Sequence, residues 1–541
     1  MTKTPWNVYP RPQMKRQRWL SLNGQWQLEG RPVTVPFPPQ SKLSGYGQPV
    51  AEQLTYETCF TVPEDWAGSR ILLHFSAVDQ IAEVWLNGKP VGRHEGGYLP
   101  FHFDITKYLH AGENKLTLCA TDTLDHTYPY GKQTKKPGGM WYTPVSGIWQ
   151  SVWLEPVPVD YLHGLRLDCD QKGVTLTLEG WNGGFDAQVE GKHYHFEGNS
   201  GRIEPEDPQL WSPEQPHLYP LQITAGEDQI ESYFALRSIA IGEVQGVQRV
   251  LLNGQPIFLH GVLDQGYFPD GIFLPEDPEE FDRDVLRMKE LGLNLLRKHI
   301  KIEPEQFYYA CDRLGMLVQQ DMVNSGGYNF LLNTALPTIG LKRWPDHLGS
   351  AHDARKDFFR QHMVDTLHHL HNHPCIIAYT IFNESWGQFR SDAMYRLAKE
   401  TDPSRLYNST SGWFAQKESD FDSEHIYFRL KTLSPKQRPL FVSECGGYTM
   451  ATEGHLYSPD KQYGYGACQS KGELSEKIVE LYEKMILPAI PKGCCGCIYT
   501  QLSDVEEEIN GLYTYDRQVC KVEAEKLRPL AQRFQQALKN K

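Results

Sequence analysis

Several features are missing from this sequence of 541 residues, and each absence excludes a class of protein. No run approaches the roughly eighteen apolar residues that a membrane-spanning helix needs. No apolar core of signal-peptide length follows the N-terminus, so we expect no secretory signal. No stretch is rich in Lys and Arg, which argues against nucleic-acid and membrane partners. The formal net charge of −13 is consistent with a soluble protein and identifies no partner.

Cysteine usage argues against a disulfide framework. The sequence has 11 cysteines, an odd number, and Cys119, Cys375 and Cys445 lie inside apolar segments. Buried, reduced thiols of this kind predict a cytoplasmic protein. Residues 494–497 hold a tighter cluster of cysteines, but no second Cys/His cluster at a zinc-finger spacing accompanies it. We therefore interpret this cluster as packing thiols and predict no metal there.

The chain is too long for one hydrophobic core, and its patterns divide it into three domains. Residues 1–156 contain short strands with turns between them, including a hairpin signal at Asn87-Gly88, and predict a jelly-roll β-sandwich. Residues 157–241 alternate with period two and predict a smaller, immunoglobulin-like β-sandwich. In residues 242–541, apolar strand-like runs alternate with helical stretches over about 300 residues, which predicts a (β/α)₈ TIM barrel.

Two glutamates follow strand-like runs in the predicted barrel. Residues 375–382 have the composition of a buried strand, and Asn383 and Glu384 come directly after them. Residues 440–443 form a second such run, which leads into Glu444. A carboxylate is costly to bury unless it is paired or takes part in chemistry. Because all strand ends of a barrel open on one face, we expect Glu384 and Glu444 to meet there despite their separation in sequence.

Two convergent carboxyl groups suit the cleavage of a glycosidic bond. One group protonates the leaving oxygen, and when the two lie about 5–5.5 Å apart the other attacks the anomeric carbon with retention of configuration. We assign Glu384 as the acid/base and Glu444 as the nucleophile. Asn383, beside the acid, is expected to hydrogen-bond a sugar hydroxyl.

Longer motifs carry a resemblance to a known family. Residues 381–386 (IFNESW) look like the acid/base motif of glycoside hydrolase family 2, which contains β-galactosidases, β-glucuronidases and β-mannosidases. Residues 441–446 (FVSECG) resemble the nucleophile strand of that family. Further similar motifs span the chain, at residues 96–101, 144–150, 210–219 and 252–262. The resemblance implies a retaining, exo-acting β-glycosidase that uses Asn383, Glu384 and Glu444 as described.

The resemblance also suggests residues that support the catalytic pair. Family members usually carry an Arg-x-Ser-His-Tyr-Pro motif after the second barrel strand, where this chain has RKHIKI at residues 297–302. Arg297 matches, and we expect it to support the nucleophile by a charge-assisted hydrogen bond. His299 would replace the family histidine one residue early. Asp321, after the third strand, is expected either to bind a sugar hydroxyl or to order Arg297.

Five aromatic or imidazole side chains complete the candidate substrate-binding set. Trp386 follows the acid directly and suits either a sugar-stacking or a core position. Tyr499 ends a barrel strand where relatives often place an aromatic platform under the sugar. His425 and Tyr427 precede the seventh strand, where the family often supplies a tyrosine near the nucleophile. Trp141 lies on a Gly-rich jelly-roll loop, and relatives use a nearby loop to close the pocket.

The terminal sugar is predicted less directly. We predict a β-galactosidase, with a β-glucuronidase or other β-hexuronidase as the alternative. β-Glucuronidases carry a late Asn-x-Lys pair that grips the substrate carboxylate, whereas the only such triplet before the C-terminal tail here is residues 87–89, in a hairpin turn. Lys298 and Lys301 are left with two interpretations, an exposed basic turn or a cation that binds a uronic acid.

The remaining predictions concern class, cofactors and partners. Two β-sandwiches of binding-module type leave a non-catalytic carbohydrate-binding protein as the rival from another class, and the intact Glu384 and Glu444 argue against it. No organic cofactor is implied. Mg²⁺ occurs near the site in some relatives, but no clear ligand set is visible in this sequence. The predicted partner is a small-molecule glycoside or oligosaccharide, and a homo-oligomer is left open.

Overall fold

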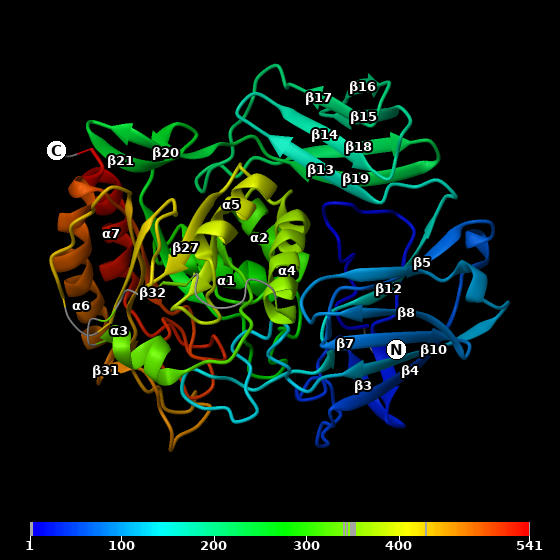
Figure 1. Cartoon of the computed structure of the whole chain (residues 1–541), viewed down its shortest axis with the longest axis horizontal. Coiled ribbons are helices and arrows are strands. Elements are labelled where there is room, and N and C mark those ends of the chain that lie inside the picture. Colours follow the sequence, from blue (N-terminus) through cyan, green and yellow to red (C-terminus); the bar gives the residue numbers. More distant parts are fainter. Residues whose placement is uncertain (1–3, 339–340, 342–344, 347–352, 428–429, 540–541) are drawn as a thin grey trace.

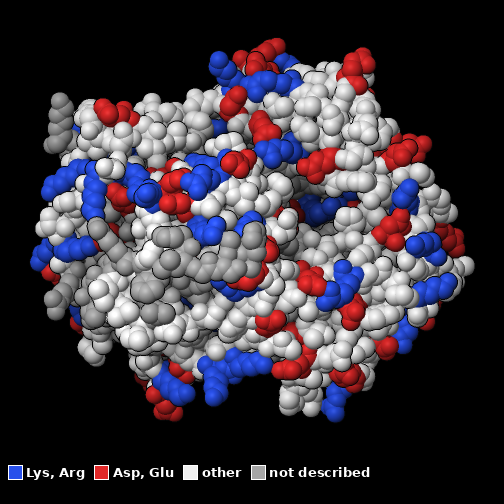
Figure 2. All heavy atoms as spheres, in the orientation of Figure 1, with Lys and Arg blue, Asp and Glu red and all other residues white. Residues whose placement is uncertain are grey.

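The computed structural model of the chain has three parts, two β-sandwiches and a barrel of parallel strands (Figure 1). It describes all residues except 1–3, 339–340, 342–344, 347–352, 428–429 and 540–541. In Figure 1 the first sandwich lies at the right, the second at the top, and the barrel with its helices at the left. On the face shown in Figure 2, Lys and Arg are interspersed with Asp and Glu.

The first sandwich is built from strands whose side chains alternate between its core and the outside. In β10 (Glu113–Thr121), Leu116, Leu118 and Ala120 are buried and the residues between them are more exposed. The predicted hairpin turn at Asn87 and Gly88, both with positive φ, joins β7 to β8. The two large sheets of the first sandwich have the strand orders β1-β12-β5-β9 and β3-β2-β4-β10-β7-β8.

The other strands and short helices of this part are β1 (Leu20–Ser21), β2 (Gly24–Leu28), β3 (Arg31–Val35), β4 (Gln53–Thr61), η1 (Glu64–Trp66), β5 (Arg70–Phe75), β6 (Val78–Asp79), β7 (Ile81–Leu86), β8 (Lys89–Glu95), β9 (Phe101–Asp104), η2 (Thr106–Tyr108), β11 (Gly147–Ile148) and β12 (Val152–Val157).

The second sandwich is smaller and has two antiparallel sheets, of orders β13-β14-β17 and β16-β15-β18-β19. Its strands are β13 (Gly164–Cys169), β14 (Val174–Glu179), β15 (Phe185–Val189), β16 (Lys192–Phe196), β17 (Ser200–Ile203), β18 (Tyr219–Ala225) and β19 (Asp228–Phe234). A three-stranded sheet follows before the barrel, formed by β20 (Ile239–Val244), β21 (Val247–Leu252) and β22 (Gln255–Pro256).

The barrel is one eight-stranded parallel sheet, with the order β27-β26-β25-β24-β23-β32-β29-β28. Its edge strands β27 and β28 lie side by side, and Asn408 Nδ2 donates to Ser423 Oγ across them at 3.1 Å, so the barrel is nearly closed. The strands are β23 (Leu259–Asp264), β24 (Leu295–Lys298), β25 (Leu317–Asp321), β26 (Ile376–Asn383), β27 (Leu406–Ser411), β28 (Asp422–Ile426), β29 (Leu440–Gly446) and β32 (Cys494–Thr500). This arrangement confirms the predicted fold class of two β-sandwiches followed by a TIM barrel.

Helices cover the outside of the barrel, which explains why a strand such as β26 is buried along its whole length. They are α1 (Glu279–Glu290), α2 (Glu305–Leu314), η3 (Leu331–Ala335), α3 (Leu336–Thr338), α4 (Ala354–Leu370), α5 (Ser391–Thr401), α6 (Lys471–Leu481), η4 (Tyr482–Ile486), η5 (Leu487–Lys492) and α7 (Ala524–Ala537). A small two-stranded sheet, β30 (Tyr448–Thr449) with β31 (Tyr465–Ala467), follows β29. None of the helices in the described part of the chain has the length and apolar character needed to cross a bilayer.

A long loop of the first sandwich, between β10 and β11, crosses to the barrel. The Tyr130 backbone N–H donates to Asn324 O at 3.0 Å, and the Tyr130 hydroxyl donates to Gly326 O at 2.7 Å. Both acceptors follow the carboxyl end of β25, on the face where barrel enzymes carry their sites. The first sandwich therefore contributes side chains to that face. The 11 cysteines are free thiols, including the buried cluster at residues 494–497.

Candidate active site

Glu384 and Glu444 stand at the carboxyl ends of two barrel strands. Glu444 lies in β29 and its side chain is 6% exposed; Glu384 follows β26 and its side chain is 18% exposed. Glu384 has a φ of 48° and Ser385 one of 62°, a left-handed conformation that is uncommon for residues other than glycine. The Glu384 backbone N–H donates to Ser411 O at 3.0 Å, which holds this bend against β27. Backbone strain of this kind is concentrated at functional sites.

Two side chains, from the end of β28 and the residue after it, join the glutamates. His425 Nδ1 lies 2.7 Å from Glu384 Oε1, and its Nε2 lies 3.6 Å from Glu444 Oε1. The Tyr427 hydroxyl lies 2.6 Å from Glu444 Oε2 and 3.4 Å from Glu384 Oε1. Because both distances start from one oxygen atom, these two carboxylate oxygens are at most about 6 Å apart. The contact of both carboxylates with one hydroxyl favours the closer spacing of a retaining pair over the wider spacing of an inverting pair, which leaves room for a water between the carboxyls.

The surroundings of Glu444 keep it ionised. Burial by itself raises the pKa of this carboxyl, but the electrostatic influence of the nearby His425, Arg297 and His299 side chains and the hydrogen bond from Tyr427 lower it to about 2. Arg297 Nη1 donates to Glu444 Oε1 at 3.0 Å. A carboxylate that is unprotonated at neutral pH can act as a nucleophile.

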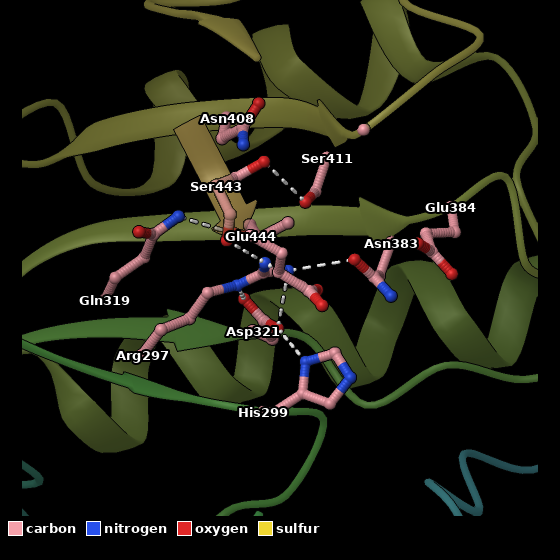
Figure 3. Close-up of polar contacts among 12 residues, drawn as sticks. Arg297, His299, Gln319, Asp321, Asn383, Glu384, Asn408, Ser411, Ser443 and Glu444 are labelled. Atoms are coloured by element: carbon pink, nitrogen blue, oxygen red, sulfur yellow. Dashed lines mark hydrogen bonds and ion pairs between the residues drawn. The ribbon is translucent and has the colours of Figure 1, made fainter. Parts of the chain in front are cut away.

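Arg297 connects the nucleophile candidate to the rest of the site (Figure 3). Its side chain is fully buried, and it donates to Glu444, to Asn383 Oδ1 at 2.9 Å and to the Asp321 carboxylate at 3.0 and 2.9 Å. Its position fits the expected support of the nucleophile, while its donors are taken by protein groups rather than left for a sugar. Because Asn383 Oδ1 accepts from Arg297, the Asn383 amide nitrogen points away from Arg297 in Figure 3 and is available to a ligand.

Asp321 and His299 form the second layer under this site. Asp321 Oδ2 accepts from His299 Nδ1 at 2.7 Å while both carboxylate oxygens pair with Arg297. Of the two roles expected for Asp321, the contacts match the ordering of Arg297. Burial lowers the pKa of His299 despite this hydrogen bond, so its ring is neutral near pH 7. The other ring nitrogen points away from Asp321 in Figure 3 and can face a ligand.

An aromatic cluster lines the side of the site next to Glu384. The Trp386 ring lies 4.7 Å from Trp141, 6.1 Å from Tyr328 and 5.5 Å from Tyr130, all in edge-on arrangements. The Trp386 indole N–H lies 3.0 Å from Gly326 O, and its ring is 3% exposed. Trp386 therefore acts mainly as a wall, and the half-buried Trp141 brings the sandwich loop against it.

Tyr499 does not face the site, which corrects the prediction that its ring forms an aromatic platform under the sugar. In the parallel register of β29 and β32 it pairs with Cys445, and paired residues share a face, so Tyr499 is on the face opposite Glu444. Its ring is 1% exposed and lies so close to Gly446 that a Cβ atom there would meet it at 2.4 Å. No ring face is left for a sugar.

Lys298 and Lys301 are not an exposed basic turn, and neither is free to hold a substrate carboxylate. Lys298 Nζ donates to Asp264 at 2.6 Å and to Glu303 at 2.9 Å; Lys301 Nζ donates to Glu303 at 2.8 Å. All four side chains are buried. These lysines form a structural ion cluster beside β23 and β24.

Several residues near the site carry no local sequence signal. Glu508 accepts from the Tyr142 hydroxyl and from Asn510 Nδ2, and burial raises the pKa of its carboxyl. Lys132 lies on the same sandwich loop as Tyr130. Only the closed fold brings these side chains together. In the described part of the chain, no group of three or more His, Cys, Asp or Glu residues is arranged so that it could hold a metal ion.

Comparison with known families gives matches along most of the chain. The matching families are "Glycosyl hydrolases family 2, sugar binding domain" at residues 10–158, "Glycosyl hydrolases family 2" at residues 169–237, and "Glycosyl hydrolases family 2, TIM barrel domain" at residues 243–471.

Individual relatives fall into two groups. The β-galactosidase of Pectobacterium atrosepticum is 26% identical over 475 residues, which cover 75% of this chain and 43% of the relative. The chain spans about half the length of the curated relatives it matches. A solved β-D-glucuronidase of Dictyoglomus thermophilum aligns with a TM-score of 0.76 and 17% identity over 97% of this chain and 98% of the other. A β-glucuronidase from Ruminococcus gnavus in complex with D-glucuronic acid aligns with a TM-score of 0.74 and 19% identity over 98% and 100%.

Proposed function

This chain belongs to glycoside hydrolase family 2, and we propose that it is a retaining β-glycosidase that removes a terminal β-linked sugar. The observation that carries the proposal is the shared hydroxyl of Tyr427, within 2.6 Å of Glu444 and 3.4 Å of Glu384. This shared contact supports the close spacing of two carboxyl groups that double displacement requires.

In the first step, Glu444 attacks the anomeric carbon and the glycosidic C–O bond breaks. Glu384 gives its proton to the leaving oxygen, so the aglycone departs as a neutral alcohol and the sugar becomes an ester of Glu444. Arg297 and Tyr427 hold the attacking carboxylate, and the free amide nitrogen of Asn383 is directed to a sugar hydroxyl.

In the second step, Glu384 takes a proton from water, and the oxygen of that water attacks the anomeric carbon. The ester bond to Glu444 breaks, and the sugar leaves with its original configuration. His425 is placed to take part in this exchange, because its Nδ1 lies 2.7 Å from Glu384 Oε1.

For the sugar, a β-linked uronic acid is our first proposal, in place of the galactose expected from the sequence. Support comes from chain length: the solved β-glucuronidases align over 98% and 100% of their own length, whereas the β-galactosidases align over only 43% and 58% of theirs. One of these neighbours holds D-glucuronic acid. The second candidate is a β-galactoside, which the sequence relatives favour.

A panel of aryl β-glucuronide, β-galacturonide, β-galactoside and β-mannoside substrates tests the proposal. We expect turnover of a uronide, and its loss in Glu444→Gln, which keeps the size of the side chain but removes the nucleophile. Turnover that survives this substitution would contradict the assignment of Glu444. Turnover of the galactoside with none of either uronide would reverse the order of the two sugars.

A further inference from the structure

A lysine of the first sandwich is held at the barrel face by the backbone around it. Tyr130, two residues before Lys132, donates its N–H to Asn324 O at 3.0 Å. Gly131 packs so closely that a Cβ atom there would lie 3.0 Å from the carbonyl oxygen of Ile300, the residue after His299. The start of the Lys132 side chain is therefore fixed beside the His299 segment of the site.

The ammonium group of Lys132 lies within electrostatic range of the catalytic centre. Its Nζ is 5.9 Å from the centroid of the Trp141 ring, in the aromatic cluster beside Glu384. Its charge contributes to lowering the pKa of His299 and opposes the rise in the pKa of Glu508. Both of these groups also respond to the charge of Glu444, so they lie near both Lys132 and the nucleophile candidate.

Lys132 differs from Arg297, Lys298 and Lys301 in having no acidic partner among the described residues. Arg297 is fully engaged by Asp321 and Glu444, and Lys298 and Lys301 are committed to their buried cluster. Within the described parts of the chain, the Lys132 ammonium makes no ion pair and no hydrogen bond, although the side chain is half-buried. A half-buried cation without a counter-ion is a ready receptor for an anion.

We propose that Lys132 binds the carboxylate of a uronic acid sugar, and so supplies from the sandwich domain the charge that selects uronides. This inference rests on the proposed function, because it presupposes a sugar bound next to Glu444. Glu508 does not neutralise Lys132 directly, since its carboxylate oxygens accept from Tyr142 and Asn510. A substrate carboxylate entering near Lys132 would complete an ion pair that the protein itself leaves open.

The test compares each uronide with its neutral counterpart: the aryl β-glucuronide with the β-glucoside, and the β-galacturonide with the β-galactoside. In Lys132→Met, the ratio of kcat/KM for the uronide to that for the neutral sugar is expected to fall at least about tenfold, the effect of losing one charge-assisted hydrogen bond. The change should appear mainly in KM for the uronide, and inhibition by free D-glucuronate should weaken in parallel. Lys132→Arg is expected to restore much of the preference.

Lys136→Met is the matched control, because Lys136 is an exposed lysine of the same loop. It should leave the ratio at the wild-type value. A wild-type enzyme that prefers uronides, with the preference intact in Lys132→Met, would overturn the role of Lys132 and leave the proposed function standing. If Lys132→Met lowers kcat/KM equally for the uronide and for the neutral sugar, the role of Lys132 is also overturned, because an equal loss indicates a structural role. A wild-type enzyme that cleaves only neutral sugars would remove the uronide proposal together with this inference.

Discussion

Replacing Tyr427 by Phe removes one hydroxyl from between the two glutamates and keeps the ring. That hydroxyl donates to Glu444 Oε2 at 2.6 Å, and the carboxylate is 6% exposed. A hydrogen bond to a charged group contributes about 1.5–3 kcal/mol. Since one pKa unit corresponds to about 1.4 kcal/mol, its loss should raise the pKa of Glu444 from about 2 by roughly one to two units.

The sign of the effect on activity follows from the role of Glu444. The nucleophile must be ionised, so activity falls as the pH drops through its pKa. In Tyr427→Phe the acid limb of the kcat/KM profile should therefore move to higher pH by roughly one to two units. The assay is kcat/KM on the best aryl β-glycoside, measured at intervals between about pH 3 and pH 8.

Tyr379→Phe provides the matched control. Tyr379 lies on β26, and its buried hydroxyl has no hydrogen-bond partner among the described residues. Removing it should leave the pH profile unchanged. If Tyr427→Phe also leaves both the acid limb and kcat/KM at the wild-type values, the hydroxyl does not tune Glu444 and the reasoning is refuted.

Three further predictions follow from the same contacts. Arg297→Met leaves two buried carboxylates without their partner and should lower the free energy of unfolding by about 3–5 kcal/mol, measured by urea denaturation; an unchanged midpoint would contradict this. Because the pKa of Glu444 is lowered from 4.5 to about 2 on folding, its ionised form stabilises the fold above about pH 4.5, and this contribution is lost as the pH falls towards 2. The Tm of the wild type minus the Tm of Glu444→Gln should decrease as the pH falls through that window. A difference that stays constant would argue against the lowered pKa. Trp141→Ala removes part of the wall beside Trp386, and should raise KM several-fold with a smaller effect on kcat, in steady-state kinetics; a fall confined to kcat would indicate another role.

The fold and the catalytic pair could be predicted from sequence because their signals are local. The apolar run before Glu384 forms β26, and the run before Glu444 forms β29. A parallel barrel then places the ends of all its strands on one face, whatever the distance between them in sequence. Arg297 could be placed for the same reason, since it is the last residue but one of β24 (Leu295–Lys298).

Other side chains could not be placed, because their position depends on register and on distant segments. Tyr499 ends its strand as expected, but its register with Cys445 sets it on the other face. Lys298 and Lys301 are neutralised by Asp264 and Glu303, contacts that no pattern in residues 297–302 reveals. Lys132 reaches the site only because a sandwich loop folds onto the barrel.

Trapping the glycosyl-enzyme tests the central claim most directly. A 2-deoxy-2-fluoro β-glycosyl fluoride of the best substrate's sugar slows the second step more than the first, so the sugar stays bound to the nucleophile. Mass spectrometry of the digested protein should then find one added sugar on the peptide that contains Glu444. An added sugar on any other residue, or rapid turnover of the reagent with no covalent adduct, would contradict the account.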